Sequence, residues 1–328
     1  MRAVVMTQFG SPDVLVPAEV PDPVAGRGQA LIEVEIANIT FVETQVRAGK
    51  PPSPAMAPQL PVIPGNGVGG VVSSVGAGVD SSLLGKRVVT GTGGSGGYAE
   101  RVAVEAAGLI EVPDDLGLAE AVALLADGRT ANALIGAARV RADETVLVEA
   151  AGGGVGSLLV QLARNAGAHV VAAAGAQRKL ELADELGANV TVNYTSPGWA
   201  DRLRERLGGV DVVFDGVGGA IGRSAFGLVR AGGRFFAFGM ASGAFAQISG
   251  GDATRLNVTV RWGPQIAPED FLGLTQTALS EAAAGRLRPL IGQTFPLERA
   301  AQAHAAIEAR ATLGKTLLLI GPKAGDSR

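Results

Sequence analysis

The residues best suited to chemistry are closely spaced glycines at positions 152–154 and 156. They follow a short apolar, β-branched segment at 145–150, and Ala151, Gly153 and Gly156 fit the G-x-G-x-x-G spacing with alanine first. A turn without side chains lets a pyrophosphate approach the backbone and directs it at the free N–H groups that open a helix. An apolar helical pattern does follow, at 155–166. The sequence therefore predicts a dinucleotide-binding turn, rather than a glycine-rich turn that binds nothing.

The end of the next predicted strand, at 169–174, distinguishes between the two nicotinamide dinucleotides. A site for NAD usually has an acid about 20 residues after the glycines, where it accepts from a ribose hydroxyl. Residues 170–177 contain no acid; Arg178 and Lys179 follow, and the first acid is Glu181. Cations are unfavourable where a helix begins unless they meet an anion. We therefore expect Arg178 and Lys179 to hold a 2′-phosphate, which favours NADPH over NADH.

Residues for metal binding or nucleophilic catalysis are scarce in this chain. It has no cysteine, which excludes disulfides, cysteine-based zinc sites and thiol nucleophiles. The two histidines, His169 and His304, lie outside the N-terminal part, have no catalytic partner nearby in sequence and are expected to be structural. Tyr98 is expected to pack in the interior. The chemistry is thus expected to be hydride transfer from a bound cofactor, with the protein aligning donor and acceptor.

Hydride addition to an electron-poor C=C bond or a quinone creates an enolate that needs a hydrogen-bond donor. The candidates are Thr40, Gln45 and backbone N–H groups of residues 238–243. The proton would come from water or from Glu43, for which a role on an exposed helix surface is an equally good interpretation.

The central part of the chain alternates short apolar segments with helical patterns. This alternation is typical of a doubly wound parallel sheet. Helices are expected at 118–126 and 130–138, joined by Asp127 and Gly128, and then at 177–186, 199–207 and 221–229. Further strands are expected at 189–194, 211–217, 234–239 and 257–262.

The N-terminal part is β-rich, with turns marked by Gly, Pro and Asp. Strands are expected at 4–9, 30–36, 70–75, 87–90 and 98–104, and a helix at 41–48. The C-terminal part is expected to add helices at 269–284 and 297–309 and strands at 292–296 and 316–320. We therefore divide the chain into a first domain at 1–117, a nucleotide-binding domain at 118–262, and a segment at 263–328 that returns to the first domain.

Length and composition limit the class of protein. The chain has 328 residues, enough for two domains, and its 47% hydrophobic and 18% charged residues are those of a folded protein. A net charge of −3 gives no reason to expect nucleic acid or an anionic membrane as a partner. Because no apolar run is long enough to span a membrane or to act as a signal peptide, a cytoplasmic location is expected.

Five segments together resemble a known family. They are VEAAGGGVGSLLVQLARNAGA at 148–168, NY at 193–194, VFDGVGG at 213–219, GGRFFAFGMASG at 232–243 and AHAAIEARATLGK at 303–315. In their order and spacing they resemble the zinc-independent quinone oxidoreductase (zeta-crystallin-like) branch of the medium-chain dehydrogenase/reductase superfamily. The resemblance covers nearly the whole chain. It implies an α/β protein with a GroES-like β-rich catalytic domain, a doubly wound Rossmann domain, NADPH between them, and a homodimer formed through the Rossmann sheet edge.

The resemblance also assigns cofactor contacts to individual residues. Gly154 and Val155, beside Gly153, would meet the pyrophosphate. The 2′-phosphate site would consist of Gly175, Lys179, Tyr194 and Arg310. The rest of the cofactor would be lined by Thr130, Val217, Phe238, Gly239, Met240, Ala241, Ser242 and Gly243, and the nicotinamide side by Phe41, Val42 and Thr44.

Three positions depart from the family pattern on the substrate side. The family commonly has Asn, Tyr and Glu where this chain has Thr40, Gln45 and Gly67. The expected function is an NADPH-dependent reductase of quinones or α,β-unsaturated ketones. Because of these departures, two alternatives stay open: a tailoring enoyl reductase that acts on one biosynthetic intermediate, and a non-catalytic NADPH-binding protein with a crystallin-like role.

Overall fold

The computed structural model describes residues 1–321, which form two compact units. The first contains residues 1–126, 278–283 and the described residues from 289 onward; the second contains 127–277 and 284–288. The expected domain boundaries lay at 117/118 and 262/263. Residues 263–277 fall in the second unit, where Phe271 lies under the Arg129 guanidinium, 4.2 Å from the ring centroid.

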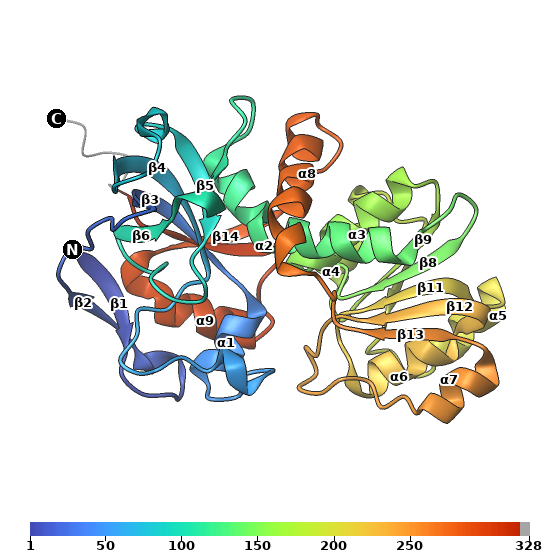
Figure 1. Cartoon of the computed structure of the whole chain (residues 1–328). Helices are drawn as coiled ribbons and strands as arrows, with labels where there is room; N and C mark the ends of the chain where they lie inside the picture. The colour runs from blue at the N-terminus through green and yellow to red at the C-terminus, as the bar shows by residue number, and fades with distance from the viewer. Residues whose placement is uncertain (322–328) are drawn as a thin grey trace. The chain divides into compact units, whose positions relative to one another are not determined.

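The first unit contains a mixed sheet that joins distant parts of the chain. Its order in the described residues is β14-β15-β3-β4-β5-β7, with β6 also paired to β3. Figure 1 shows the red C-terminal strands beside the blue β3, and β15 pairs with β3 in antiparallel orientation. The bounds are β3 (Gln29–Ile39), β4 (Gly67–Val75), β5 (Arg87–Gly91), β6 (Arg101–Glu105), β7 (Ile110–Glu111), β14 (Ile291–Pro296) and β15 (Lys315–Leu319).

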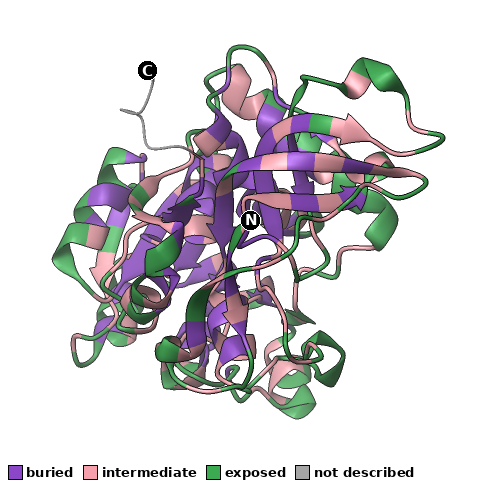
Figure 2. Cartoon of the chain, turned by 90° about the vertical axis from the view of Figure 1, so that its left-hand side faces the viewer, coloured by how far each residue is buried: buried purple, intermediate pink, exposed green. Residues whose placement is uncertain are grey.

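Alternation along the strands forms the core of this unit. In β3, Ala30, Ile32 and Val34 are buried while their neighbours are partly exposed, as a period of two requires. Figure 2 shows buried residues concentrated along the strands and exposed residues in the connections. The helices α1 (Phe41–Arg47) and α9 (Ala300–Glu308) contact each other and complete the unit.

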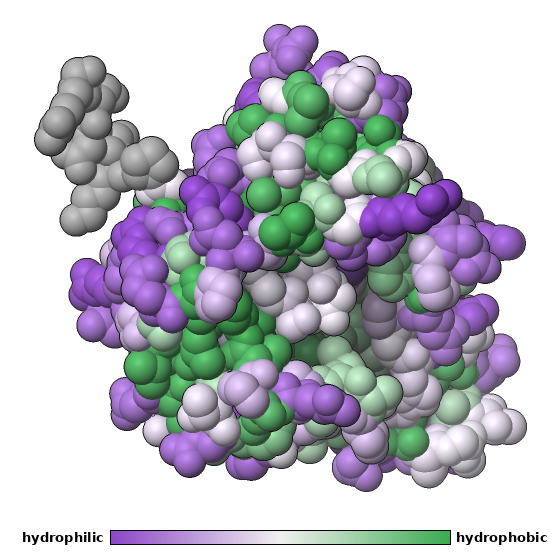
Figure 3. Space-filling model, turned by 60° about the vertical axis from the view of Figure 1, so that its left-hand side comes forward, coloured by the Kyte–Doolittle hydropathy of each residue, from purple (hydrophilic) through white to green (hydrophobic). Residues whose placement is uncertain are grey.

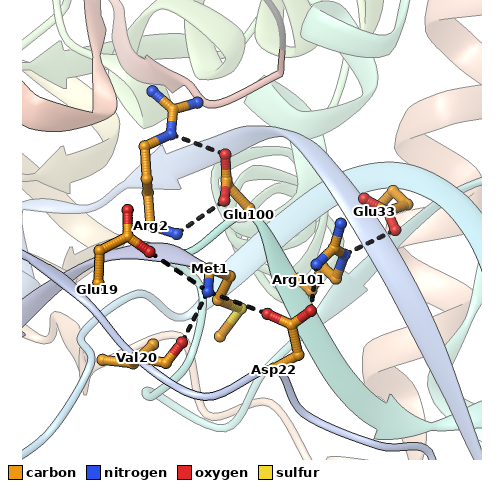
Figure 4. A network of polar contacts seen from close by, with 8 residues as sticks. All are labelled: Met1, Arg2, Glu19, Val20, Asp22, Glu33, Glu100 and Arg101. Carbon is orange, nitrogen blue, oxygen red and sulfur yellow. Dashed lines mark hydrogen bonds and ion pairs between the residues drawn. The ribbon is translucent and has the colours of Figure 1, made fainter.

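A hairpin of β1 (Arg2–Met6) and β2 (Leu15–Glu19) precedes this sheet. The terminal ammonium of Met1 donates to the Val20 carbonyl at 2.7 Å and pairs with Asp22 at 3.0 Å (Figure 4). Arg101 bridges Asp22 and Glu33. The carboxylates of Asp22 and Glu33 are about half exposed, so these ion pairs contribute little to stability, but they join the hairpin to the sheet.

The second unit contains a six-stranded parallel sheet within the described chain, in the order β10-β9-β8-β11-β12-β13. The strand order reverses between β8 (Thr145–Glu149) and β11 (Val210–Asp215). This confirms the predicted doubly wound sheet. The remaining strands are β9 (His169–Ala174), β10 (Val190–Asn193), β12 (Val229–Ala237) and β13 (Thr259–Trp262).

Helices cover both faces of this sheet (Figure 1). Helices α3 (Gly154–Asn165) and α4 (Gln177–Glu185) pack on β8, β9 and β10. The opposite face is covered by α5 (Trp199–Leu207), α6 (Gly219–Gly227) and α7 (Gly250–Leu256). The helix α8 (Phe271–Ala283) follows β13. Short 3-10 helices span Pro12–Val14, Pro54–Met56, Ser81–Leu83, Ala106–Gly108, Pro268–Asp270 and Leu297–Arg299.

One helix prediction was wrong. Residues 118–138 form a single helix, α2 (Leu118–Ala138), rather than two helices joined by Asp127 and Gly128. A glycine inside a helix costs about 1 kcal/mol relative to alanine. Burial of Leu124 and Leu134 on either side outweighs that cost, so the helix continues through the glycine.

The surface mixes residue types. Figure 3 shows hydrophilic and hydrophobic residues side by side on the face that it presents. Large apolar side chains that reach solvent include Val24, Phe245 and Trp262. Within residues 1–321, no helix is both long and apolar enough to cross a bilayer.

Candidate functional site

The predicted dinucleotide turn joins β8 to α3. Gly153 is the N-cap of α3, in an extended conformation with φ −92° and ψ 175°, and as a glycine it has no side chain of its own to cap the helix. The N–H of Gly153 itself donates to the Ala150 carbonyl at 2.8 Å. The N–H groups of the first turn of a helix have no partner within the helix. Gly154 and Val155 therefore present an N-terminus suited to an anion.

The glycines of this turn are required by close packing. A Cβ on Gly156 would lie 2.2 Å from the Ala150 carbonyl oxygen, and one on Gly154 would lie 1.9 Å from Asp127 Oδ2. Both distances are far below van der Waals contact. The absent side chain of Gly156 thus lets α3 approach the backbone that follows β8, and that of Gly154 leaves room for the Asp127 carboxylate.

The predicted 2′-phosphate residues of the second unit lie close to this turn. A Cβ on Gly152 would meet the Lys179 Cβ at 2.7 Å, so the base of Lys179 lies against the glycines. Likewise, a Cβ on Gly175 would meet the Tyr194 ring at 2.9 Å. Lys179 is partly exposed in the first turn of α4, and Arg178 beside it is exposed. The structure thus places cations beside the N-terminus of α3, an arrangement that fits a phosphorylated dinucleotide.

The two loops predicted to line the rest of the cofactor are bonded to each other. Ser242 donates its N–H to the Val217 carbonyl at 2.8 Å, and Phe238 donates to the Asp215 carbonyl at 2.9 Å. The carboxylate of Asp215 accepts the N–H groups of Val217 and Gly218 at 2.9 and 2.6 Å. Val217 is buried and both of its backbone groups are hydrogen-bonded, to Asp215 and Ser242, so its contact with a cofactor stays a prediction. Within 239–243, Gly239, Met240 and Ala241 are partly exposed.

Asp127 lies beside the glycine turn, a position that the sequence does not indicate. Its carboxylate is buried and lies against Gly154, at the start of α3. No sequence signal indicated this position, because the expected break in α2 placed Asp127 in a turn. Thr130, a predicted cofactor residue, lies one turn further along the same helix and is partly exposed.

In the first unit, the candidate acid Glu43 supports the start of α1. Its Oε2 accepts the N–H of Thr40 at 2.7 Å and the Thr40 hydroxyl at 2.9 Å, and its Oε1 accepts the N–H of Asn66 at 3.2 Å. Burial raises the pKa of Glu43, and the hydrogen bonds from Thr40 act against that rise. The alternative role for Glu43 on an exposed helix surface is wrong, because its carboxylate binds two chain segments in the interior.

These bonds also limit what the other catalytic candidates can do. The Thr40 hydroxyl gives its proton to Glu43 and accepts the Asn66 amide at 3.2 Å. Thr44 is fully buried and its hydroxyl donates to the Phe41 carbonyl at 2.7 Å. Gln45 is partly exposed, as are Phe41 and Val42. The Gln45 Nε2 donates one N–H to the Thr44 hydroxyl at 3.2 Å, which leaves the second N–H for a ligand. Among the candidates on α1, Gln45 is therefore the side chain best able to offer a donor to a ligand.

A buried tyrosine–histidine pair lies behind Glu43. Tyr98 Oη and His304 Nε2 are 3.0 Å apart, and both residues are fully buried. Burial lowers the pKa of His304 to about 3, so its ring is neutral. Burial, with the nearby Glu43 carboxylate, raises the pKa of Tyr98 well above its ordinary value. The two residues are separated by 206 positions, which is why no sequence pattern indicated the pair.

Arg310, the remaining predicted phosphate contact, belongs to the first unit. It follows α9 in the left-handed conformation, with φ 56°, and it is exposed. Its role stays a prediction. Within residues 1–321, no group of three or more His, Cys, Asp or Glu side chains is arranged to hold a metal ion.

Comparisons with known proteins agree with this architecture. Residues 26–114 match the family model of the alcohol dehydrogenase GroES-like domain, and residues 154–277 match that of zinc-binding dehydrogenase. The chain is 32% identical to quinone oxidoreductase of Rattus norvegicus, over 98% of each chain. It is also 32% identical to 2-haloacrylate reductase of a Burkholderia species, over 97% of this chain and 99% of the relative.

A solved structure is similar along almost the whole length. Escherichia coli quinone oxidoreductase, crystallised in complex with NADPH, superposes with a TM-score of 0.89 at 28% identity. The match covers 97% of this chain and all of that one.

Proposed function

The chain belongs to the quinone oxidoreductase branch of the medium-chain dehydrogenase/reductase superfamily, and on that premise we propose that it reduces quinones or α,β-unsaturated carbonyl compounds without a catalytic zinc. It is an NADPH-dependent oxidoreductase. The observation that carries the proposal is the glycine turn that opens α3, with Lys179 packed against Gly152. NADPH, when bound, supplies the hydride.

The residues of this chain supply binding and orientation. The N–H groups of Gly154 and Val155 hold the pyrophosphate, and Lys179 neutralises the 2′-phosphate. The turn held by Asp215 and the segment 238–243 orient the remainder of the dinucleotide. Gln45 lies on α1, the helix whose start Glu43 caps, and it offers a hydrogen bond to the oxygen on which negative charge develops. Water delivers the final proton.

The proposed substrate class follows from the chemistry that two relatives share. One is named for quinones and the other for 2-haloacrylate. Both are conjugated, electron-poor acceptors of a hydride at carbon or oxygen. The absence of cysteine from the sequence supports a reaction without zinc, because the usual zinc ligands of dehydrogenases include Cys. We further propose a cytoplasmic homodimer.

A panel of acceptors tests this proposal. Oxidation of NADPH would be followed with a benzoquinone, a naphthoquinone, a cyclic enone and 2-chloroacrylate, before and after dialysis against a strong chelator. We expect turnover with at least one acceptor class and no loss after chelation. Analysis of the product separates saturation of a C=C bond from reduction of a quinone. An enzyme that binds NADPH but turns over no acceptor would contradict the proposal.

A further inference from the structure

Two buried carboxyl groups lie at the point where the strand order reverses. Glu149 ends β8 and Asp215 ends β11, and both are fully buried. The two strands are neighbours, and Val148 pairs with Phe214, so Glu149 and Asp215 lie one residue beyond that pair. Ligands of open parallel sheets bind at the carboxyl ends of the strands, where the strand order reverses. The pair therefore lies beneath the expected dinucleotide site.

Most of the oxygens of this pair lack a donor. Neither Glu149 oxygen, nor Asp215 Oδ2, accepts a hydrogen bond from any N–H or O–H group in residues 1–321. The register of the two neighbouring strands places Glu149 beside Asp215, and both carboxyl groups are buried there. Two buried carboxylates side by side repel each other, and one shared proton removes that repulsion. Burial and the Asp215 charge raise the pKa of Glu149 well above its ordinary value, so Glu149 carries the proton.

The other oxygen of Asp215 has a defined task. Oδ1 accepts the N–H groups of Val217 and Gly218. The Val217 carbonyl of this turn accepts the N–H of Ser242. Gly218 needs its glycine here, since its φ is 72° and a Cβ would lie 2.1 Å from the Ala244 carbonyl oxygen. The position of Asp215 thus sets the geometry of both loops that line the strand ends.

We propose that Glu149 is a positioning residue for the cofactor: its carboxyl proton bridges to Asp215 Oδ2 and holds the turn at 216–218 in the geometry that binds NADPH. The inference rests on the proposed function, because it takes NADPH as the ligand of these loops. It predicts that ionisation of Glu149 loosens the turn, so affinity for NADPH falls as the pH rises.

Within residues 1–321, neither Glu149 oxygen nor Asp215 Oδ2 has a cationic side chain as a hydrogen-bond partner. Asp215 is the titratable group that faces Glu149. Helix α6 covers Asp215 through Gly222, whose added Cβ would lie 2.3 Å from Oδ2. Three arginines on the surrounding elements pair with other carboxylates: Arg223 with Asp252, Arg230 with Asp211 and Arg234 with Glu144. Two further basic residues lie at the ends of their elements: His169 is the first residue of β9, and Arg164 is in the last turn of α3.

Two substitutions distinguish the effect of the hydrogen bond to Asp215 from the effect of ionisation at position 149. Glu149→Gln keeps a donor toward Asp215 but cannot ionise, whereas Glu149→Leu removes the donor and leaves Oδ2 unsatisfied. Calorimetry would measure the dissociation constant of NADPH from near-neutral to alkaline pH. We expect the natural protein to bind more weakly as the pH rises and Glu149→Gln to keep its affinity. Glu149→Leu should bind about tenfold more weakly throughout, the cost of an unsatisfied buried acceptor. The exposed Glu185→Gln, on α4, is the matched control and should follow the natural protein.

Thermal unfolding gives a readout that needs no cofactor. The folded protein retains a proton on Glu149 that the unfolded chain releases above the ordinary pKa of 4.5. The stability of the natural protein relative to Glu149→Gln should therefore decrease as the pH rises above that value.

Equal pH dependence of the two proteins in both measurements would overturn the inference, as would Glu149→Leu binding NADPH like the natural protein. Failure of the natural protein to bind NADPH at all would instead overturn the proposed function, and unfolding would still test the pair.

Discussion

Lys179 is the residue whose position bears most directly on the choice of cofactor. Its side chain begins against Gly152, beside the start of α3, and it is partly exposed. A cation in that place would stabilise a 2′-phosphate more than a ribose hydroxyl, because the phosphate is charged.

Substitution of Lys179 by alanine should therefore weaken NADPH binding about 10- to 100-fold, the value of a charge-assisted hydrogen bond, and leave NADH binding nearly unchanged. Calorimetric titration of both nucleotides measures this. The control is Lys86→Ala, a half-exposed lysine of the first unit that pairs with Glu111. An equal loss for NADPH and NADH would contradict the assigned role.

His304 gives a prediction about stability and pH. Its pKa of about 3 in the folded protein lies below the ordinary 6.5, so only the unfolded chain takes up a proton between these values. The stability associated with His304 is complete above pH 6.5 and is lost as the pH falls toward 3. At neutral pH, His304→Gln should lower the free energy of unfolding by about 1–2 kcal/mol. Between pH 6.5 and 3, urea unfolding should show a smaller further decrease in that free energy for His304→Gln than for the natural protein. Parallel pH curves for the two proteins would rule this out.

At the residue scale, the sequence can indicate neighbours where the residues are close together in the chain. The glycine turn and the two cations lie within one βαβ unit, and the structure brings Gly152 and Lys179 together. Tyr98–His304 and Glu149–Asp215 join positions 206 and 66 apart, respectively; a single sequence carries no signal for such partners.

At the scale of elements, the contact between β8 and α3 depends on a missing side chain. Gly156→Ala would place a Cβ against the Ala150 carbonyl oxygen and should destabilise the fold by about 1–3 kcal/mol, as overpacking does. Gly136→Ala is the matched control: it is exposed within α2 with nothing within 4 Å of the added Cβ. That variant should be more stable by about 0.5–1 kcal/mol. Chemical denaturation compares them, and equal effects would contradict the packing argument.

The parallel strands could be predicted because strands buried on both faces form continuous apolar runs. Strand β2 escaped prediction because it is short and contains Pro17, and β7 because it has two residues. The break expected in α2 shows the opposite error, a local signal at Gly128 that burial in the folded protein overrides.

At the scale of the whole molecule, the edge strand β13 is the surface that we propose for a homodimer. Phe245 and Trp262 pack edge to face at 6.0 Å, and 36% and 43% of their surfaces remain exposed. Light scattering should give the mass of a dimer, and Trp262→Glu should shift it toward a monomer because a charge is costly in an apolar interface. Val24→Glu, 85% exposed in the first unit, is the control and should leave the mass unchanged. A monomeric natural protein would contradict the proposal.

The unit boundaries could be predicted only coarsely from sequence. The composition changes from β-rich to alternating near residue 118, but the compact units change at 126/127, inside α2. A helix that continues across a boundary carries no composition signal there.

Competition between the two nucleotides tests the central claim most directly. Calorimetric titration of the natural protein with NADPH, and then with NADH in the presence of NADPH, compares their affinities for the same turn. The account predicts that NADPH binds at least tenfold more tightly, as expected for one charge-assisted contact to the 2′-phosphate. Equal affinities, tighter binding of NADH, or binding of neither nucleotide would contradict it.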